Sequence, residues 1–181
     1  MSAARITRQD LPEHSHIATQ TPGADFADCY LFADPCPQAS AMETYLVVMG
    51  RTPRWMDFLM AVRNQAVRLV GLKNLGGMQR PPSDKPASAY RVGERVGIFS
   101  LIHLSEDEVI VCDDDKHLRV QVSVFKHRAQ GLSVVSVSTV VHNHNRLGRL
   151  YMAVVGPVHQ RIVPLLLSQA LHAQSPNPAH R

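Results

Sequence analysis

Between residues 95 and 142, four segments alternate apolar and polar side chains with the period of two that marks β-strands. They cover Arg95–Leu104, Glu108–Cys112, His117–His127 and Leu132–His142. Only short turns separate them, and strands joined by tight turns form an antiparallel meander. In the third segment the apolar residues Leu118, Val120, Val122 and Val124 share one side, whereas the other side is mixed. We therefore predict an antiparallel sheet with one face in the core and the other facing solvent.

The segments on either side of this meander have the patterns of one strand and three helices. Phe26–Ala33 reads as a first strand, and Ser40 with Glu43 forms a capping box for a helix ending near Met49. Thr52–Lys73 is apolar over more than half its circumference, which suits a helix that lies across a sheet. Arg146–His172 is predicted as a long last helix, with Asn143 or Asn145 as its N-cap.

This order of elements predicts an α+β fold in which a curved antiparallel sheet wraps around the long C-terminal helix, with two short helices after the first strand. It resembles the helix-grip fold of the Bet v 1/START-like (SRPBCC) superfamily, which usually encloses a cavity between sheet and helix. We expect residues 1–24 to be a polar N-terminal arm, residues 25–172 a single helix-grip-like domain, and residues 173–181 a tail.

Composition excludes several classes of protein. The 181 residues carry a net charge of +4, but the basic residues are scattered and form no patch, so we expect no nucleic-acid partner. No uncharged apolar run reaches the roughly 20 residues that a membrane span needs, and residues 1–16 lack the apolar core of a signal peptide. Cys29, Cys36 and Cys112 have no CxxC spacing and are predicted to be free thiols. We expect a cytoplasmic protein without a membrane partner.

Four segments resemble an uncharacterised bacterial family known as domain of unknown function 2867. They are ADFADCY near residue 24, WMDFLMAVRNQAVRLVGLK, DDDKHLRVQVSV and HNHNRLGRLYMAVVGPVHQRIV. The family is similar in layout to the Bet v 1-like superfamily, and related domains occur fused behind nucleotide-binding reductase domains. This chain has no GxGxxG-type loop, so the resemblance implies no cofactor, and it brings no catalytic residues.

Five residues are candidates for binding a ligand: Arg63, Trp55, Met60, Tyr151 and His159. Arg63 lies inside the apolar arc of the central helix with Trp55 and Met60, so it extends to solvent, pairs with a carboxylate, or faces a wet cavity. His159 lies in the apolar arc of the last helix, either as a neutral core residue or as a hydrogen-bond donor or base in a cavity. Tyr151 either packs or binds an anionic head group. We expect no metal, because His142 and His144 alone do not make a site.

Three functional hypotheses follow. The preferred hypothesis is that the chain binds a small apolar or amphipathic molecule in a cavity between the sheet and the C-terminal helix. The second is an enzyme of the cyclase, hydratase or isomerase kind on the same scaffold, with His159 or an aspartate as general base. The third is a non-catalytic interaction module, such as a homodimer or a partner of a separate reductase.

Overall fold

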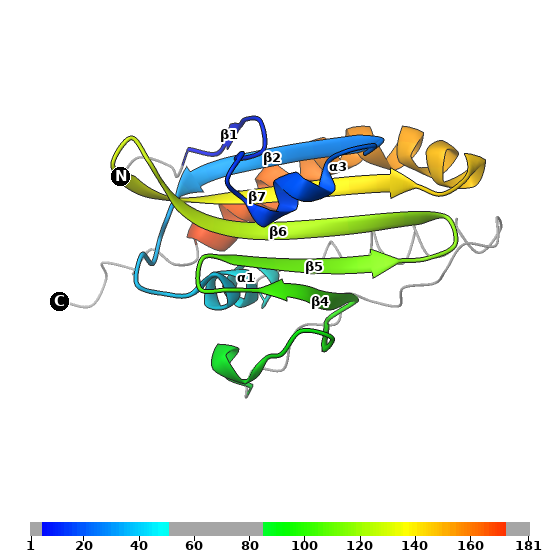
Figure 1. The fold of residues 1–181 in the computed structure, drawn as a ribbon. Helices are drawn as coiled ribbons and strands as arrows, with labels where there is room; N and C mark the ends of the chain where they lie inside the picture. The colour runs from blue at the N-terminus through cyan, green and yellow to red at the C-terminus, as the bar shows by residue number, and fades with distance from the viewer. Residues whose placement is uncertain (1–4, 51–84, 173–181) are drawn as a thin grey trace.

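A computed structural model of the chain describes residues 5–50 and 85–172, in which an antiparallel sheet packs against helices (Figure 1). Among the described residues the sheet has seven strands, in the order β1-β2-β7-β6-β5-β4-β3. The strands are β1 Thr7–Arg8, β2 Phe26–Ala33, β3 Arg95–Val96, β4 Phe99–Leu104, β5 Glu108–Asp114, β6 Leu118–Ala129 and β7 Leu132–Asn143. The helices are α1 Ala41–Gly50 and α3 Arg146–His172, and the 3₁₀ turns are η1 His16–Gln20 and η2 Ala87–Ala89.

The predicted fold class is confirmed. Strands β3 to β7 form the expected meander. The first long strand, β2, pairs with the last strand, β7, and α3 packs on these two strands. Figure 1 shows α3 lying along one face of the curved sheet, behind β2 and β7, with α1 behind β4 and β5 on the same side. A curved antiparallel sheet that holds a long C-terminal helix is the layout of a helix-grip fold.

Strand alternation divides the sheet into a helix-facing face and an outer face. On β2 the helix-facing residues are Phe26, Asp28, Tyr30 and Phe32, and their partners on β7 are Val141, Thr139, Val137 and Val135. This face carries the main core, in which Tyr30, Phe32, Val135 and Val137 pack with Tyr45 of α1 and with Leu167 and Leu171 of α3. The apolar side predicted for the third strand of the meander is therefore the side that packs against α3.

The two predicted helix starts that lie within the described residues are confirmed by their hydrogen bonds. The backbone N–H of Ser40 donates to Glu43 Oε2 at 2.7 Å, and the N–H of Glu43 donates to Ser40 Oγ at 3.2 Å, which completes the capping box. At α3, Asn145 Oδ1 accepts from the N–H groups of Leu147 and Gly148 at 3.0 and 3.1 Å. The cap fixes the point at which the chain leaves the sheet and turns back along it.

One predicted strand is interrupted by a turn, and one predicted helix is not among the described residues. The strand predicted over Arg95–Leu104 is broken into β3 and β4, because Gly97 takes a positive φ of 65° and forms a hairpin turn. The helix predicted over Thr52–Lys73 lies outside the described residues.

The outer face of the sheet is partly covered, although the sequence predicted that it would meet solvent. The N-terminal segment contributes the edge strand β1 and then η1, which lies across the front of the sheet in Figure 1. Ile17 of η1 is fully buried against Ile110 and Val140. The polar outer-face residues Gln121, Ser123, Ser136 and Ser138 are also buried, so this mixed face is a second, smaller interior.

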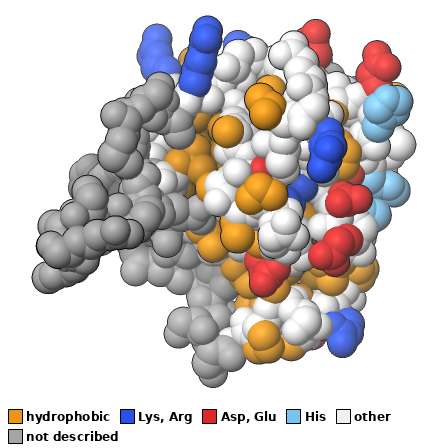
Figure 2. Space-filling model, turned by 90° about the vertical axis from the view of Figure 1, so that its left-hand side faces the viewer, with side chains coloured by type: hydrophobic (Ala, Val, Ile, Leu, Met, Phe, Trp, Pro, Cys, Tyr) orange, Lys and Arg blue, Asp and Glu red, His pale blue; other side chains and the backbone are white. Residues whose placement is uncertain are grey.

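Figure 2 views the molecule from the left-hand side of Figure 1. On the described surface visible there, hydrophobic side chains lie in several groups separated by polar surface, and acidic and histidine side chains gather towards one edge. This view of the surface therefore shows no dominant apolar patch among the described residues that would mark a partner site.

Candidate functional site

His159 points from α3 towards the sheet, into a group of polar side chains on the helix-facing face. Its Nε2 lies 3.2 Å from Thr139 Oγ1 and 3.6 Å from Asp28 Oδ2. The ring of Phe26 meets the imidazole edge-on, with the ring centroids 5.7 Å apart. The His159 side chain is 27% exposed, so it contacts both solvent and the buried polar side chains.

The fold explains why these residues meet. The β2–β7 register places Asp28 directly opposite Thr139, with both side chains on the helix-facing face. Gly156, one turn before His159, has no side chain, and a Cβ there would touch the Phe26 ring at 3.6 Å. α3 therefore lies in van der Waals contact with Phe26 of β2, and the imidazole reaches both strand residues.

Asp28 is the unusual member of this cluster. Its carboxylate is fully buried, with 0% of the side chain exposed, and neither oxygen accepts a hydrogen bond from the described residues. A buried carboxylate without full hydrogen bonding costs several kcal/mol unless another group compensates the charge. His159 is the described basic group placed to do this, but at 3.6 Å it makes an ion-pair contact beyond hydrogen-bonding distance.

Tyr30 lies next to Asp28 on the same face of β2. Burial, followed by the negative charge of Asp28 and by the closeness of its carboxylate to the hydroxyl, raises the pKa of the Tyr30 hydroxyl above its ordinary value. The hydroxyl therefore stays protonated, and it donates to the backbone carbonyl of Gln160 at 3.1 Å. Tyr30 thereby anchors α3 to the sheet beside His159.

The surroundings of this cluster are apolar. Val122 of β6 and Val163 of α3 are partly buried and pack against the main core, which also contains Val137. The polar cluster therefore lies among aliphatic side chains between the sheet and α3. The arrangement can accept a hydrogen-bond donor at Asp28 and can position the His159 imidazole for donating or accepting a proton.

The predicted site residues fall into two groups. His159 is described and lies at the cluster, whereas Tyr151 is partly buried and lies two turns earlier, roughly 12 Å away along the helix. The structure therefore does not bring these two side chains together. Arg63, Trp55 and Met60 lie outside the described residues.

Sequence reasoning missed Asp28 and Thr139. A signal for Asp28 was present, because the alternation in FADCYLFA puts Asp28 on the same face as Phe26, Tyr30 and Phe32. A carboxylate at a core-facing strand position is rarely found without a task or a partner. Thr139 carried no such signal, because threonine is common in strands.

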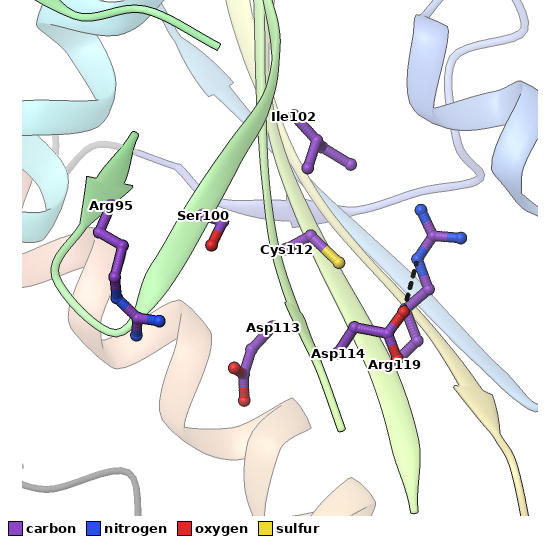
Figure 3. Close-up of a pocket in the computed structure, with 7 residues that line it drawn as sticks. All are labelled: Arg95, Ser100, Ile102, Cys112, Asp113, Asp114 and Arg119. Carbon is purple, nitrogen blue, oxygen red and sulfur yellow. Dashed lines mark ion pairs between the residues drawn. The ribbon is translucent and has the colours of Figure 1, made fainter. Parts of the chain in front are cut away.

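A separate pocket of about 280 Å³ lies at the other end of the sheet, among β3, β4, β5 and β6 (Figure 3). Seven residues line it: Arg95, Ser100, Ile102, Cys112, Asp113, Asp114 and Arg119. Arg119 Nε lies 3.9 Å from Asp114 Oδ2, and His144 Nε2 lies 2.9 Å from Asp114 Oδ1, so each oxygen of Asp114 has a partner. Burial raises the pKa of the Cys112 thiol, which keeps it protonated and a poor nucleophile.

The two histidines at the end of β7 contact different groups. His142 Nε2 faces the carbonyl oxygen of Pro22 at 3.3 Å, whereas His144 pairs with Asp114. Within the described part of the chain no three histidine, cysteine or acidic side chains are grouped to hold a metal ion.

Comparison with known proteins places the chain in a family but not in a functional class. Residues 20–166 match the family described as Protein of unknown function (DUF2867), which supports the resemblance seen in the four sequence segments. No curated protein and no solved structure matches the chain. The functional argument therefore rests on the site itself.

Proposed function

The chain belongs to the DUF2867 family, and we propose that it binds a small amphipathic molecule between the sheet and α3. In this proposal the ligand places a hydrogen-bond donor on the Asp28 carboxylate and its apolar part against neighbouring aliphatic side chains. The observation that carries the proposal is the fully buried Asp28, which accepts no hydrogen bond from the described residues.

Energetics support a ligand-binding role for Asp28. Nearly all buried polar groups in proteins are hydrogen-bonded, and exceptions call for an explanation. A hydroxyl, amide or amine on a ligand would supply the donor that the strands lack, and a hydrogen bond to a charged group is worth about 1.5–3 kcal/mol. The site would therefore discriminate against purely apolar molecules, which would leave the carboxylate without a hydrogen bond.

One observation favours a second candidate, an enzyme that moves a proton. Asp28 Oδ2 lies 3.6 Å from His159 Nε2, and a carboxylate and an imidazole side by side are the groups that general acid–base catalysis uses most often. With Nε2 turned towards Asp28 and Thr139, Nδ1 would be the nitrogen that exchanges a proton with a substrate. This candidate uses the same ligand and the same residues, and differs only in turnover.

Native mass spectrometry of protein purified from its own host tests the binding proposal. We expect wild-type protein to carry a bound small molecule, Asp28→Asn to lose it, and the exposed control Asp10→Asn to keep it. Binding is contradicted if Asp28→Asn carries the same molecule at the same occupancy, or if the wild type carries none and binds no amphipathic probe.

Turnover is tested with the molecule identified in that experiment. If the chain is an enzyme, incubation with wild-type protein converts the molecule, and His159→Gln binds it without converting it. If both proteins return the molecule unchanged, only the binding function stands.

A further inference from the structure

The outward side of α3 presents a row of apolar side chains to solvent. Leu150, Val154, Val158 and Leu165 are between 46 and 67% exposed. At about 100° per residue they fall within one quadrant of the helix, opposite the side that packs on the sheet. We call these four residues the α3 outer row.

The charged side chains of α3 itself are all basic. Arg161 lies within the row and is exposed, Arg146 and Arg149 are exposed at the start of the helix, and α3 contains no aspartate or glutamate. An apolar stripe with arginines and no carboxylate is the composition of helices that lie in the interface of anionic membranes.

In this fold, α3 would lie on a membrane surface rather than cross it. Among the described residues, α3 is long and apolar enough to span a membrane by length and composition alone. Its inner side is already engaged, because Tyr30 donates to Gln160 and because Leu167 and Leu171 belong to the core. Among the described residues, the outer side of α3 is the side left exposed.

We propose that the α3 outer row binds an anionic phospholipid surface, with the helix axis parallel to the membrane plane. Charge decides between this occupant and a second copy of the chain. A second α3 would bring more arginines and no carboxylate to Arg161, whereas lipid phosphates supply the matching charge. The expectation of no membrane partner rested on the lack of an uncharged spanning run, and a helix lying on the surface needs none.

The test is flotation of the full chain with vesicles. We expect it to float with vesicles of phosphatidylcholine mixed with phosphatidylglycerol, to bind phosphatidylcholine alone weakly, and to dissociate as salt is raised, because salt screens the arginine–phosphate attraction. Val154→Glu is expected to weaken binding by at least about tenfold, since it removes buried apolar area and adds a repelled charge. Arg161→Gln is expected to weaken it by about fivefold.

The matched control is Val92→Glu, which makes the same substitution at an exposed valine outside α3. Val92 is 60% exposed, close to the 67% of Val154, so both variants should fold like the wild type in a thermal unfolding measurement. The membrane proposal is overturned if the wild type floats with neither vesicle, if it binds both vesicles equally, or if Val92→Glu weakens binding as much as Val154→Glu. If the wild type forms a dimer without lipid and Val154→Glu is a monomer, the α3 outer row binds a second copy of the chain and not a membrane.

Discussion

Both faces of the sheet bury carboxylates, and Glu108 on the outer face and Asp28 on the helix-facing face have opposite hydrogen-bonding environments. On the outer face, Glu108 Oε1 accepts from the N–H of Ile17 at 3.1 Å and from Ser123 Oγ at 2.6 Å, and Oε2 accepts from the N–H of His16. On the helix-facing face, Asp28 accepts no hydrogen bond from the described residues.

On the binding proposal, this difference separates a structural carboxylate from one kept for a ligand. The three donors to Glu108 come from η1 and β6, so the carboxylate fixes the N-terminal segment to the sheet. Asp28 ties no described segment down, and a sequence optimised only for stability would place an apolar residue there. Uncompensated polar groups are typical of sites that trade stability for binding or catalysis.

Asp34 shows that the helix-facing side can satisfy a buried carboxylate. Its fully buried side chain lies 3.2 Å from Lys126 Nζ and accepts from Ser133 Oγ at 3.0 Å. Lys126 also donates to the carbonyls of Cys36 and Ala39 in the loop that leads to α1. Asp28 and Asp34 therefore differ in the groups that contact them, although both lie on the helix-facing side.

The largest effect is expected from breaking this satisfied ion pair. Lys126→Met leaves Asp34 buried without its cation and should lower the free energy of unfolding by about 3–5 kcal/mol. Urea unfolding measures the loss. If the loss is below about 1 kcal/mol, which is the range of an exposed pair, the buried pair does not contribute as described.

Glu108→Gln is expected to cost about 2–3 kcal/mol, because its amide group turns a donor towards the N–H of His16. The same urea series gives the value, and limited proteolysis should show earlier cleavage near η1. An unchanged unfolding midpoint would mean that Glu108 does not hold the N-terminal segment.

Two glycines of α3 test how closely the helix approaches the Asp28 face. A Cβ at Gly148 would collide with the backbone oxygen of His117, so Gly148→Ala should destabilise by about 1–3 kcal/mol. At Gly156 the nearest atoms allow ordinary contact, so Gly156→Ala should be neutral or stabilise by up to about 1 kcal/mol. The melting temperatures of the two variants test this difference. If Gly148→Ala lowers the melting temperature no more than Gly156→Ala does, α3 lies further from the sheet than described.

A small pH effect is expected on the outer face. His103 stacks on His16 with ring centroids 4.2 Å apart, and burial, followed by the charge of His16, lowers the pKa of His103. The unfolded chain then binds a proton at this residue more readily than the folded chain does. The contribution of neutral His103 to the free energy of unfolding is therefore full above the unfolded pKa of about 6.5, and it is lost as the pH falls through the lowered pKa of the folded chain. His103→Gln should therefore reduce the drop in melting temperature between about pH 7.5 and about pH 5.5. If the melting temperature of His103→Gln falls as much as that of the wild type, His103 does not cause the pH effect.

Much of the fold could be predicted because its signals are local. The bounds of β2 and α3, the Ser40–Glu43 capping box and the Asn145 cap follow from alternation, helical period and cap chemistry. The break at Gly97 was missed because one glycine in an alternating run does not show whether it takes a positive φ.

The site was harder to predict because it depends on contacts between distant segments. His159 was singled out by its place on an apolar helix face, but its partners come from β2 and β7, and no single-sequence pattern gives the strand register. The same limit applies to the outer face, where Glu108 is satisfied by η1, a polar segment with no strong periodicity.

The free energy of unfolding of ligand-free Asp28→Asn, measured beside wild type and Glu108→Gln, tests the central claim most directly. The amide removes a buried charge that lacks hydrogen bonds, so we predict that Asp28→Asn is as stable as wild type or more stable, whereas Glu108→Gln is less stable. If Asp28→Asn loses as much stability as Glu108→Gln, Asp28 is a structural carboxylate and the proposed binding site loses its support.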